Sequence, residues 1–332
     1  MKTLRGVNLG GWLVLERWMT PSLFAGTEAK DEYSFMQTDD ALQKMRNHEM
    51  TFITEEDFIW LSEHRIDAVR IPIGYWILDG DGPLMPSISK LDWAIRMAEQ
   101  YEIKVLVCLH GAPGSQNGMD HSGRIGKARW YDEQKFRDQT IDILKRLVIR
   151  YKDKPSLWGI ELLNEPTMKL YQPKLRKFYR QSYDEIVSAA RTGLAVVFHD
   201  AFMPRLMSGV LWPYKNFPVY LDHHWYHFFV PQWLQPKLSL SLYYRFLRAR
   251  GRMLGRLQRT QPVLIGEWSG IIGWGKLNKY PRNEHDEIIR RHYKEQCEIY
   301  KGVAGWFYWS YKTEERGVYH FRSMVEDGFF DS

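Results

Sequence analysis

Two glutamates stand at the ends of apolar runs, where catalytic side chains are expected. Glu165 directly follows the apolar run 157–164, and Glu267 ends the apolar run 262–267. Paired carboxylates flanking a glycosidic bond are the basic apparatus of glycoside hydrolysis. One must be ionised to attack the anomeric carbon, and the other must carry a proton for the leaving oxygen, which requires a raised pKa. The pair therefore indicates carbohydrate chemistry.

The other apolar runs also end in polar or aromatic side chains. These are Asn8, Arg70, His110, Asn164, His199, Asp200, His223, His224, Tyr226 and Trp309. Their recurrence where apolar runs stop predicts one site built from many strand ends. A buried unpaired carboxylate is costly, so Glu165 and Glu267 are the hardest to explain by structure alone. Arg70 and Tyr226 have alternatives, a structural ion pair and a core tyrosine.

A metal site is the alternative reading of the same residues. His110, His224, Asp222 and the two glutamates offer ligand atoms. No close His-x-His or HExxH spacing organises them, so we favour the acid–base pair. Two carboxylates suffice for glycoside hydrolysis, and we expect neither a metal nor an organic cofactor.

Eight apolar runs are expected to be strands. They cover 4–9, 66–71, 103–110, 157–164, 195–200, 218–224, 262–267 and 303–309. Nearly continuous apolar runs of this kind are typical of parallel strands that are buried on both faces. Helical periodicity covers 55–65, 89–101, 132–151, 173–191 and 283–300.

Eight such units predict an α/β fold, a single (β/α)8 TIM barrel that occupies residues 1–332 as one domain. The first two strand starts are 62 residues apart, which predicts extra loop, and the 23 residues between the fifth and sixth leave room for a short helix only. Thr54, followed by Glu56 and Asp57, predicts a helix start. In barrels, catalytic groups lie at the carboxyl ends of the strands.

The composition is that of a globular protein. The 332 residues are 44% hydrophobic and 26% charged. The 49 aromatic residues, 15% of the chain, can fill a core and can also stack on sugars. The net charge of +6 is too mild to indicate nucleic acid. No apolar run approaches the ~20 residues that span a bilayer. Cys108 and Cys297 form neither a disulfide scaffold nor a metal-site spacing.

Eight ordered blocks carry a family resemblance. They are RGVNLGGWLVLE (5–16), WMTPSLF (18–24), VRIPIGYW (69–76), LHGAPGSQNG (109–118), ELLNEP (161–166), DHHWYHFF (222–229), GEWSG (266–270) and GWFYWSYKTE (305–314). Together they resemble glycoside hydrolase family 5, most closely its exo-β-1,3-glucanase branch, best known from fungi. The resemblance covers almost the whole chain and implies a retaining (β/α)8 glycosidase.

The resemblance also implies roles. Glu165 of NEP would be the general acid/base and Glu267 of GEWSG the nucleophile. Arg70 would keep Glu267 ionised, and Tyr226 would donate to the same carboxylate. The residues that would hold the sugar are Asn164, His110, His224 and Trp309. His223 and Asn8 are expected to be structural, while Trp12 and Trp306 fit core and site equally well.

The entrance of the implied pocket shows one departure. Glu16, at the end of the first block, would bind the non-reducing-end glucose and close the cleft, which implies release of single glucose units. Asp120 belongs to the loop that walls the pocket. The branch carries two phenylalanines that clamp the next sugar. Phe229 matches one of them, but Met119 stands in place of the other, and methionine specifies less. The linkage and aglycone preference therefore stay open.

The implied function is that of a retaining β-glucosidase or exo-β-glucanase, with β-1,3-glucan oligosaccharides as the leading substrate. The same covalent intermediate could also pass its glycosyl group to a sugar, which would be transglycosylation. The alternatives are an endo-β-1,4-glucanase or a glycolipid or aryl β-glucosidase of the same family. A non-catalytic carbohydrate-binding barrel is a distant third, since both glutamates are present.

Two features bear on location and partners. The first residues hold no apolar signal-peptide stretch, so we expect a cytoplasmic enzyme, or a processed form of a secreted one. Between 237 and 259 stand Lys237, Arg245, Arg248, Arg250, Arg252, Arg256 and Arg259, with no Asp or Glu. We expect a barrel helix with a solvated basic face, and the alternative is contact with an anionic membrane surface.

Overall fold

The computed structural model describes residues 3–167, 173–212, 217–226, 239–272 and 277–330. Eight parallel strands close into a barrel in chain order, and β1 completes it by pairing with β8. The strands are β1 (Leu4–Asn8), β2 (Ala68–Gly74), β3 (Lys104–Gly111), β4 (Leu157–Glu161), β5 (Ala195–His199), β6 (Val219–His224), β7 (Val263–Trp268) and β8 (Gly305–Tyr308). The predicted (β/α)8 barrel is confirmed.

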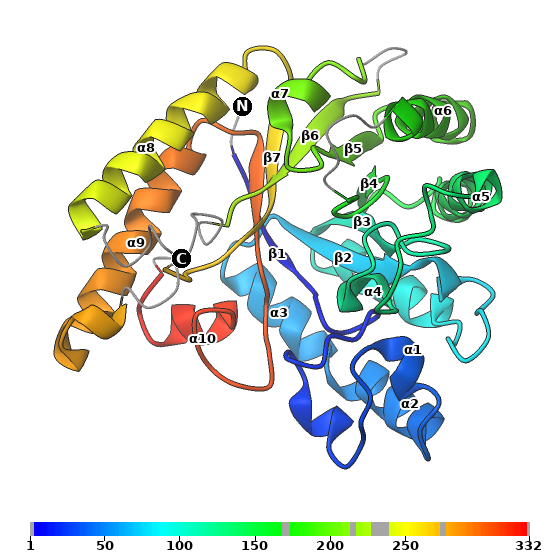
Figure 1. Cartoon of the computed structure of the whole chain (residues 1–332), viewed down its shortest axis with the longest axis horizontal. Helices are drawn as coiled ribbons and strands as arrows, with labels where there is room; N and C mark the ends of the chain where they lie inside the picture. Colours follow the sequence, from blue (N-terminus) through cyan, green and yellow to red (C-terminus); the bar gives the residue numbers. More distant parts are fainter. Residues whose placement is uncertain (1–2, 168–172, 213–216, 227–238, 273–276, 331–332) are drawn as a thin grey trace.

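Helices surround the barrel (Figure 1). They are α1 (Glu32–Phe35), α2 (Ala41–Thr51), α3 (Glu55–Glu63), α4 (Ile88–Gln100), α5 (Gln134–Arg150), α6 (Pro173–Ala189), α7 (Pro204–Met207), α8 (Leu240–Leu257), α9 (His285–Tyr300) and α10 (Phe321–Glu326). The long first interval holds α1 and α2 before α3, where extra loop was predicted. The short interval holds the four-residue α7, as predicted. Thr54 and Asp57 form a capping box at the start of α3, which confirms that helix start.

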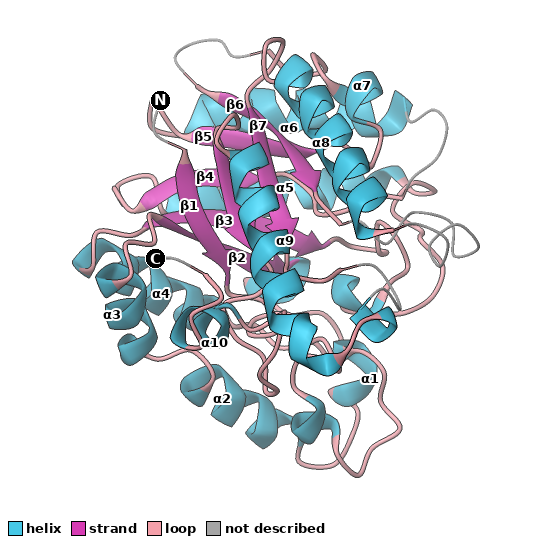
Figure 2. Cartoon of the chain, turned by 90° about the vertical axis from the view of Figure 1, so that its left-hand side faces the viewer, coloured by secondary structure: helices cyan, strands magenta, loops and turns pink. Residues whose placement is uncertain are grey.

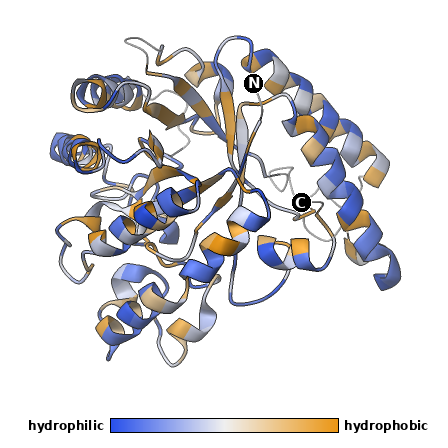
Figure 3. Cartoon of the chain, turned by 180° about the vertical axis from the view of Figure 1, so that it is seen from behind, coloured by the Kyte–Doolittle hydropathy of each residue, from blue (hydrophilic) through white to orange (hydrophobic). Residues whose placement is uncertain are grey.

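The core has two parts. One cluster fills the barrel interior with side chains from five strands, including Leu106, Leu264 and Phe307. Gly6 makes room for that layer, because a Cβ there would lie 2.4 Å from the Phe307 ring. The larger cluster lies between the strands and the helices. The strands are mainly apolar, while the outer helices alternate between apolar and polar residues (Figure 3).

The basic stretch forms α8, as expected. One apolar face of the helix, which includes Tyr243, Leu247 and Leu254, is buried, whereas Leu242 and Phe246 are exposed. The helix α8 lies beside α9 on the outside of the barrel (Figures 1 and 2). Among the residues that the structure describes, no helix is long and apolar enough to cross a membrane.

Four strands end earlier than the sequence predicts, and two of them, β4 and β8, affect the site. β4 stops at Glu161, so Asn164 and Glu165 belong to the loop that follows it. β8 stops at Tyr308, one residue before Trp309. These residues still lie at the carboxyl ends of the strands, but the conformation of a loop sets their direction.

Candidate active site

Arg70, on β2, is fully buried and connects the site. Its Nε and Nη2 donate to the two carboxylate oxygens of Glu161 at 2.7 and 3.0 Å. Its Nη1 donates to Asn8 Oδ1 at 2.8 Å and to Glu267 Oε1 at 3.0 Å. Nη2 also donates to Asn164 Oδ1 at 2.8 Å. All five guanidinium N–H groups are therefore used, and they fix two carboxylates and two amides in place.

Glu267, on β7, is held from two sides. Arg70 binds Oε1, and the Tyr226 hydroxyl donates to Oε2 at 3.0 Å. Both contacts were expected from the sequence. A carboxylate held at both oxygens presents a fixed lone pair to its surroundings, as a nucleophile requires.

Glu165 faces the imidazole of His224, the last residue of β6. His224 Nδ1 donates to Glu165 Oε1 at 2.5 Å, and the same nitrogen lies 3.5 Å from Glu267 Oε2. Because these two distances add to 6.0 Å, the two carboxylate oxygens are no more than 6.0 Å apart. Carboxyl groups lie roughly 5–5.5 Å apart in retaining glycosidases and roughly 6.5–9.5 Å apart in inverting ones. The geometry fits retention.

The protons are distributed differently from the expectation. Burial raises the pKa of Glu267 to about 7, although the charges of His224 and Arg70 lower it. Burial also acts to raise the pKa of Glu165, but the charge and hydrogen bond of His224 outweigh it and lower the pKa to about 2. Burial opposes a charge on His224, yet Glu267, Asp222 and Glu165 raise its pKa well above the usual value.

The expectation of a raised pKa on the acid is therefore wrong for the free protein, and the pKa of the nucleophile is raised rather than low. For Glu165 the cause is His224, a cation that contacts both carboxylates, and for Glu267 the cause is burial. The proton that Glu165 needs is held on His224 Nδ1, within one 2.5 Å hydrogen bond of Glu165. Proton donation then requires only transfer along that bond.

The loop after β4 holds Glu165 in an uncommon backbone conformation, with a φ of 37°. Asn117 Nδ2 donates to the Glu165 carbonyl at 3.0 Å, and Gln116 Nε2 donates to the Asn164 carbonyl at 3.0 Å. These contacts stabilise a backbone conformation that residues with a Cβ rarely adopt. Backbone strain of this kind is typical of functional sites. The SQNG segment therefore positions the acid.

His110, Asn164 and Trp309 form one wall. The rings of His110 and Trp309 are stacked with centroids 5.5 Å apart. Asn164 Nδ2 donates to His110 Nε2 at 3.4 Å. Burial lowers the pKa of His110 well below its usual value, so the ring is neutral. The wall offers a flat aromatic surface and neutral hydrogen-bonding groups, which suit a sugar.

Most of the residues that were expected to close the pocket lie in the described part of the chain. Trp18 Nε1 donates to Glu16 Oε2 at 2.8 Å, and Glu16 is buried. Burial, Asp120 and Glu267 raise the pKa of Glu16 well above its usual value. Met119 is 53% exposed. Phe229 lies outside the described residues.

Sequence reasoning missed Glu161 and His121, and it considered Asp222 only as a possible metal ligand. Glu161 holds Arg70 through two hydrogen bonds. Asp222 accepts from His224 Nε2 at 3.2 Å and from the Gly266 N–H at 2.6 Å. His121 Nε2 lies 3.5 Å from Glu165 Oε2. A charged residue inside an expected buried strand was the available signal for Glu161 and Asp222.

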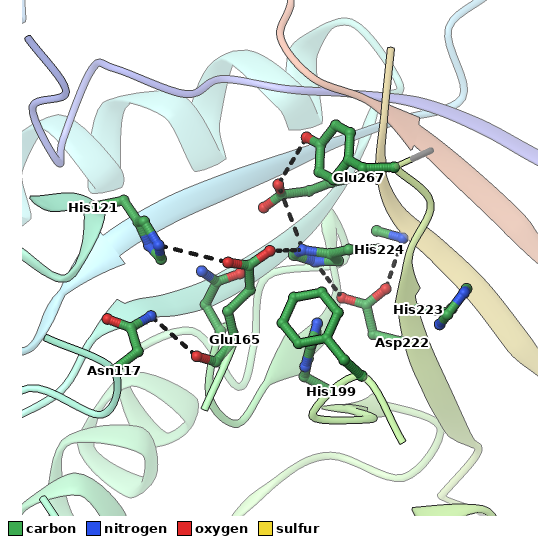
Figure 4. A network of polar contacts seen from close by, with 12 residues as sticks. Asn117, His121, Glu165, His199, Asp222, His223, His224 and Glu267 are labelled. Atoms are coloured by element: carbon green, nitrogen blue, oxygen red, sulfur yellow. Dashed lines mark hydrogen bonds and ion pairs between the residues drawn. The ribbon is translucent and has the colours of Figure 1, made fainter. Parts of the chain in front are cut away.

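Asn8 and His223, which were expected to be structural, make structural contacts, and Trp12 and Trp306 belong to the core. Asn8 Nδ2 donates to the carbonyls of Gly266 and Tyr308 at the barrel mouth. His223 Nδ1 contacts Asp200 Oδ2 at 2.5 Å, away from the glutamates (Figure 4). Trp12 and Trp306 are buried in the large core cluster.

Within the described part of the chain, two groups of side chains bring metal-ligand atoms within 4.8 Å of one another: Glu165, His199 and His224, and Glu161, Asp222 and His224. A ligating histidine must offer an unprotonated nitrogen. His224 lies among carboxylates that keep it charged, and Arg70 Nη2 lies 4.0 Å from Asp222 Oδ2. These donor sets suit protons better than a metal ion.

Comparison with known proteins places this site in context. No family model matches the chain. The chain is 34% identical over 370 residues to the probable glucan 1,3-β-glucosidase A of Emericella nidulans, covering 98% of this chain and 89% of that protein. It is 32% identical over 375 residues to the glucan 1,3-β-glucosidase of Blumeria graminis, covering 98% and 86%.

Among solved structures, the rutinosidase from Aspergillus niger has the same fold, with a TM-score of 0.82 and 20% identity over 100% of this chain and 98% of that chain. The full-length sequence relationships, rather than the shared fold, decide the family. This chain belongs to glycoside hydrolase family 5, in its exo-β-1,3-glucanase-like branch.

Proposed function

We propose that this chain is a retaining, exo-acting β-glucosidase whose leading substrates are β-1,3-glucan oligosaccharides. The observation that carries the proposal is the pair of carboxylate oxygens, of Glu165 and Glu267, no more than 6.0 Å apart on either side of His224. Residues 1–332 would act as one catalytic domain.

In the first step, a Glu267 oxygen attacks the anomeric carbon and the glycosidic C–O bond breaks. Glu165 gives its proton, held on His224 Nδ1 in the free protein, to the leaving oxygen. The product is a covalent glycosyl-enzyme. Arg70 and Tyr226 keep the attacking carboxylate oriented, and Trp309 supports the sugar ring.

In the second step, a water oxygen attacks the anomeric carbon and the bond to Glu267 breaks. Glu165, now ionised, takes the proton of that water. A sugar hydroxyl in place of water would give transglycosylation. Asn164 is in place to contact the 2-hydroxyl, since Arg70 holds its side-chain oxygen and leaves the amide nitrogen toward His110.

The exo assignment rests on Glu16, and the linkage rests on the relatives named glucan 1,3-β-glucosidases. One observation favours a second candidate, a β-glucosidase acting on glycolipids or aryl glucosides. Met119 is exposed where the branch has an aromatic clamp. A flexible apolar side chain there suits a non-sugar aglycone.

The test is a product time course on laminari-oligosaccharides, cellobiose, gentiobiose and an aryl β-glucoside. We expect glucose to appear one unit at a time and β-1,3 substrates to lead. Internal cleavage would contradict exo action, and cleavage of the aryl glucoside alone would favour the second candidate. Glu267→Gln should lower turnover on every substrate by on the order of 10⁴-fold or more.

Contact with an anionic membrane surface is a weaker proposal. The exposed residues Arg245, Arg252 and Arg256 lie along α8, and the exposed Arg259 follows its end. Lys237 lies outside the described residues. Arg248 is paired with Glu295, and Arg250 stacks over Trp225 at 4.3 Å, so these two have intramolecular roles. Liposome sedimentation with and without anionic lipid tests the proposal, and equal, negligible binding to both would end it. We propose no nucleic-acid partner.

A cytoplasmic location is likewise proposed. It is supported by the composition of the chain, whose two cysteines cannot form a disulfide scaffold of the kind common in secreted proteins. Cell fractionation tests it, and activity recovered mainly outside the cells would contradict it.

A further inference from the structure

His199, the last residue of β5, is a completely buried side chain that the mechanism above does not use. The Ala201 N–H donates to its Nδ1 at 2.9 Å. Nδ1 is therefore an acceptor, and in the neutral ring the proton lies on Nε2. Burial and the charge of His224 lower the pKa of His199 to about 4, so the ring is neutral near pH 7. One backbone contact thus fixes the tautomer.

The turn after β5 provides that contact. Ala201 and Phe202 have φ values of 51° and 59°, a left-handed conformation that is uncommon for residues with a Cβ. The Phe202 N–H donates to Asp200 Oδ1 at 2.7 Å, which stabilises the turn. The turn directs the Ala201 N–H back to His199, and this leaves Nε2–H as the free end of the ring.

Nε2 of His199 has no hydrogen-bond partner in the described part of the chain. Buried donors rarely stay unpaired, and each exception needs an explanation. One nitrogen of His199, one oxygen of Glu165 and one nitrogen of His224 lie within 4.8 Å of one another. Figure 4 shows His199 below both Glu165 and His224. Because Nδ1 is occupied, Nε2 is the nitrogen that can serve Glu165.

We propose that His199 is a positioning residue that donates its Nε2–H to the Glu165 carboxylate as that group gives its proton to the leaving oxygen. This inference rests on the proposed function. The Glu165 O–H bond breaks, the proton goes to the glycosidic oxygen, and the His199 N–H bond stays intact. Before cleavage, Glu165 takes its proton from His224 and becomes a carboxylic acid. A donor binds a carboxylate more strongly than a carboxylic acid, so relative to this protonated state the contact stabilises the transition state.

The charges around this contact define what it can do. His199 faces Asp200, whose Oδ1 is 4.0 Å from Nδ1, and on β6 it faces Asp222 and His224, the latter with ring centroids 4.4 Å apart. Glu165 faces His224 at 2.5 Å and His121 at 3.5 Å. His224 already holds the proton of the site, so the neutral His199 adds a directed hydrogen bond and no further charge.

The test compares a substrate that needs acid catalysis with one that does not. Laminaribiose has a poor leaving group, whereas 2,4-dinitrophenyl β-glucoside leaves without a proton. His199→Phe should lower kcat on laminaribiose by about 10- to 100-fold, as loss of one charge-assisted hydrogen bond predicts. On the activated glucoside, the loss should be less than about 3-fold. KM should change little, because the contact forms during cleavage.

The pH profile and two polar variants give independent readouts. A donor lowers the pKa of a carboxylate, so His199→Phe should move the alkaline limb of kcat on laminaribiose to higher pH. His199→Gln places an amide nitrogen near the position of Nε2 and should recover part of the loss. His199→Asn places it near Nδ1 and should not. If the phenylalanine variant does not fold, the comparison of the Gln and Asn variants still tests whether a donor at the position of Nε2 is needed.

Equal losses on both substrates, or equal activity of the Gln and Asn variants, would overturn the role of His199. The activity of the wild-type protein distinguishes a wrong role for His199 from a wrong proposed function. If it cleaves no β-glucoside at all, the proposed function itself is wrong. If it cleaves both substrates and the variants lose activity uniformly, only the inference about His199 is wrong.

Discussion

Nδ1 of His224 lies 2.5 Å from Oε1 of Glu165. The same nitrogen is 3.5 Å from Glu267, and Nε2 donates to Asp222 at 3.2 Å. Both nitrogens therefore carry protons, and the imidazolium lies between the acid and the nucleophile. These groups titrate as one unit, because each charge changes the pKa values of the others.

Removal of this cation should shift the pH–rate profile. Because His224 lowers the pKa values of both Glu165 and Glu267, His224→Gln should raise both. Glu267 must be ionised, which sets the acid limb, and Glu165 must be protonated, which sets the alkaline limb. Both limbs of kcat/KM should move to higher pH, by on the order of one unit.

The matched control is the neighbouring imidazole. His223 contacts Asp200 and neither glutamate in the described structure, so His223→Gln should leave both limbs in place. The measurement is kcat/KM from pH 4 to 9 on one aryl β-glucoside. A downward shift in His224→Gln, or equal shifts in the two variants, would contradict the assignment of the cation.

Glu165→Ala should separate the two steps of the reaction. Hydrolysis of laminari-oligosaccharides should fall by about 10²- to 10⁴-fold, because general acid catalysis is lost. The first step on 2,4-dinitrophenyl β-glucoside should be nearly unchanged, since that leaving group needs no proton. Azide should partly restore turnover and yield the β-glucosyl azide, because a small anion fits where the carboxylate stood.

The stereochemistry of the azide product is the decisive observation. A β-azide requires two displacements at the anomeric carbon, and so a covalent intermediate on the opposite face. An α-azide, or unchanged cleavage of unactivated oligosaccharides, would show that Glu165 is not the acid/base.

Arg70 should matter for stability as well as activity. Arg70→Met leaves Glu161 buried with its two hydrogen bonds lost. Loss of one partner of a buried pair costs about 3–5 kcal/mol in the free energy of unfolding. Arg70→Met with Glu161→Gln should recover part of that loss, because the uncompensated charge is removed. Urea unfolding of the single and double variants measures the difference.

A surface pair provides the control. Arg146 bonds Asp79 near solvent, so Arg146→Met should cost less than about 1 kcal/mol. If Arg70→Met unfolds no more easily than Arg146→Met, then the buried network does not stabilise the barrel in the way its geometry indicates.

The fold could be predicted because its signals are local. Each strand is an apolar run, and the ends of those runs meet at one edge of a barrel whatever the exact lengths. Arg70, Tyr226 and Glu267 could be placed together for the same reason. Glu161 was overlooked inside its apolar run, although a lone carboxylate there requires a buried partner.

The proton distribution could not be predicted. It depends on the distance between His224 and the two glutamates, which β6 and β7 set through a register shift between Asp222 and His224. Gly266 contributes as well, because a Cβ there would lie 2.2 Å from Asp222 Oδ2. His121 reaches Glu165 through the fold of a loop, and neither periodicity nor spacing reports such a contact.

Stability should fall in mild acid because of histidines outside the site. Burial lowers the pKa of His48 to about 4, while its Nε2 donates to the Gly11 carbonyl at 2.8 Å. Burial lowers the pKa of His292 to about 3. In the unfolded chain both titrate near ~6.5, so below that pH the unfolded state binds protons that the native state does not.

Their stabilising contribution is complete above about pH 6.5 and is lost as the pH falls toward 4, by up to about 1.4 kcal/mol per unit for each group. Glu32 acts oppositely, since burial raises its pKa to about 8 and its contribution is lost as the pH rises. Melting temperatures from pH 4.5 to 7.5 should therefore depend less on pH in His48→Gln than in the wild type. If the melting temperatures of His48→Gln and the wild type depend on pH in the same way, then His48 does not contribute to the loss of stability in acid.

Glu16 should decide where the chain is cut. Its carboxylate accepts from Trp18 Nε1 at 2.8 Å and is buried, which fits a polar end to the pocket. Glu16→Ala should weaken selection of the terminal glucose, so that laminaribiose appears beside glucose among the first products of laminaripentaose. Trp18→Phe keeps a ring and removes only the N–H donor, so it should change KM but not the product pattern. Chromatography of early time points tests both variants, and a glucose-only pattern in Glu16→Ala would show that another group closes the pocket.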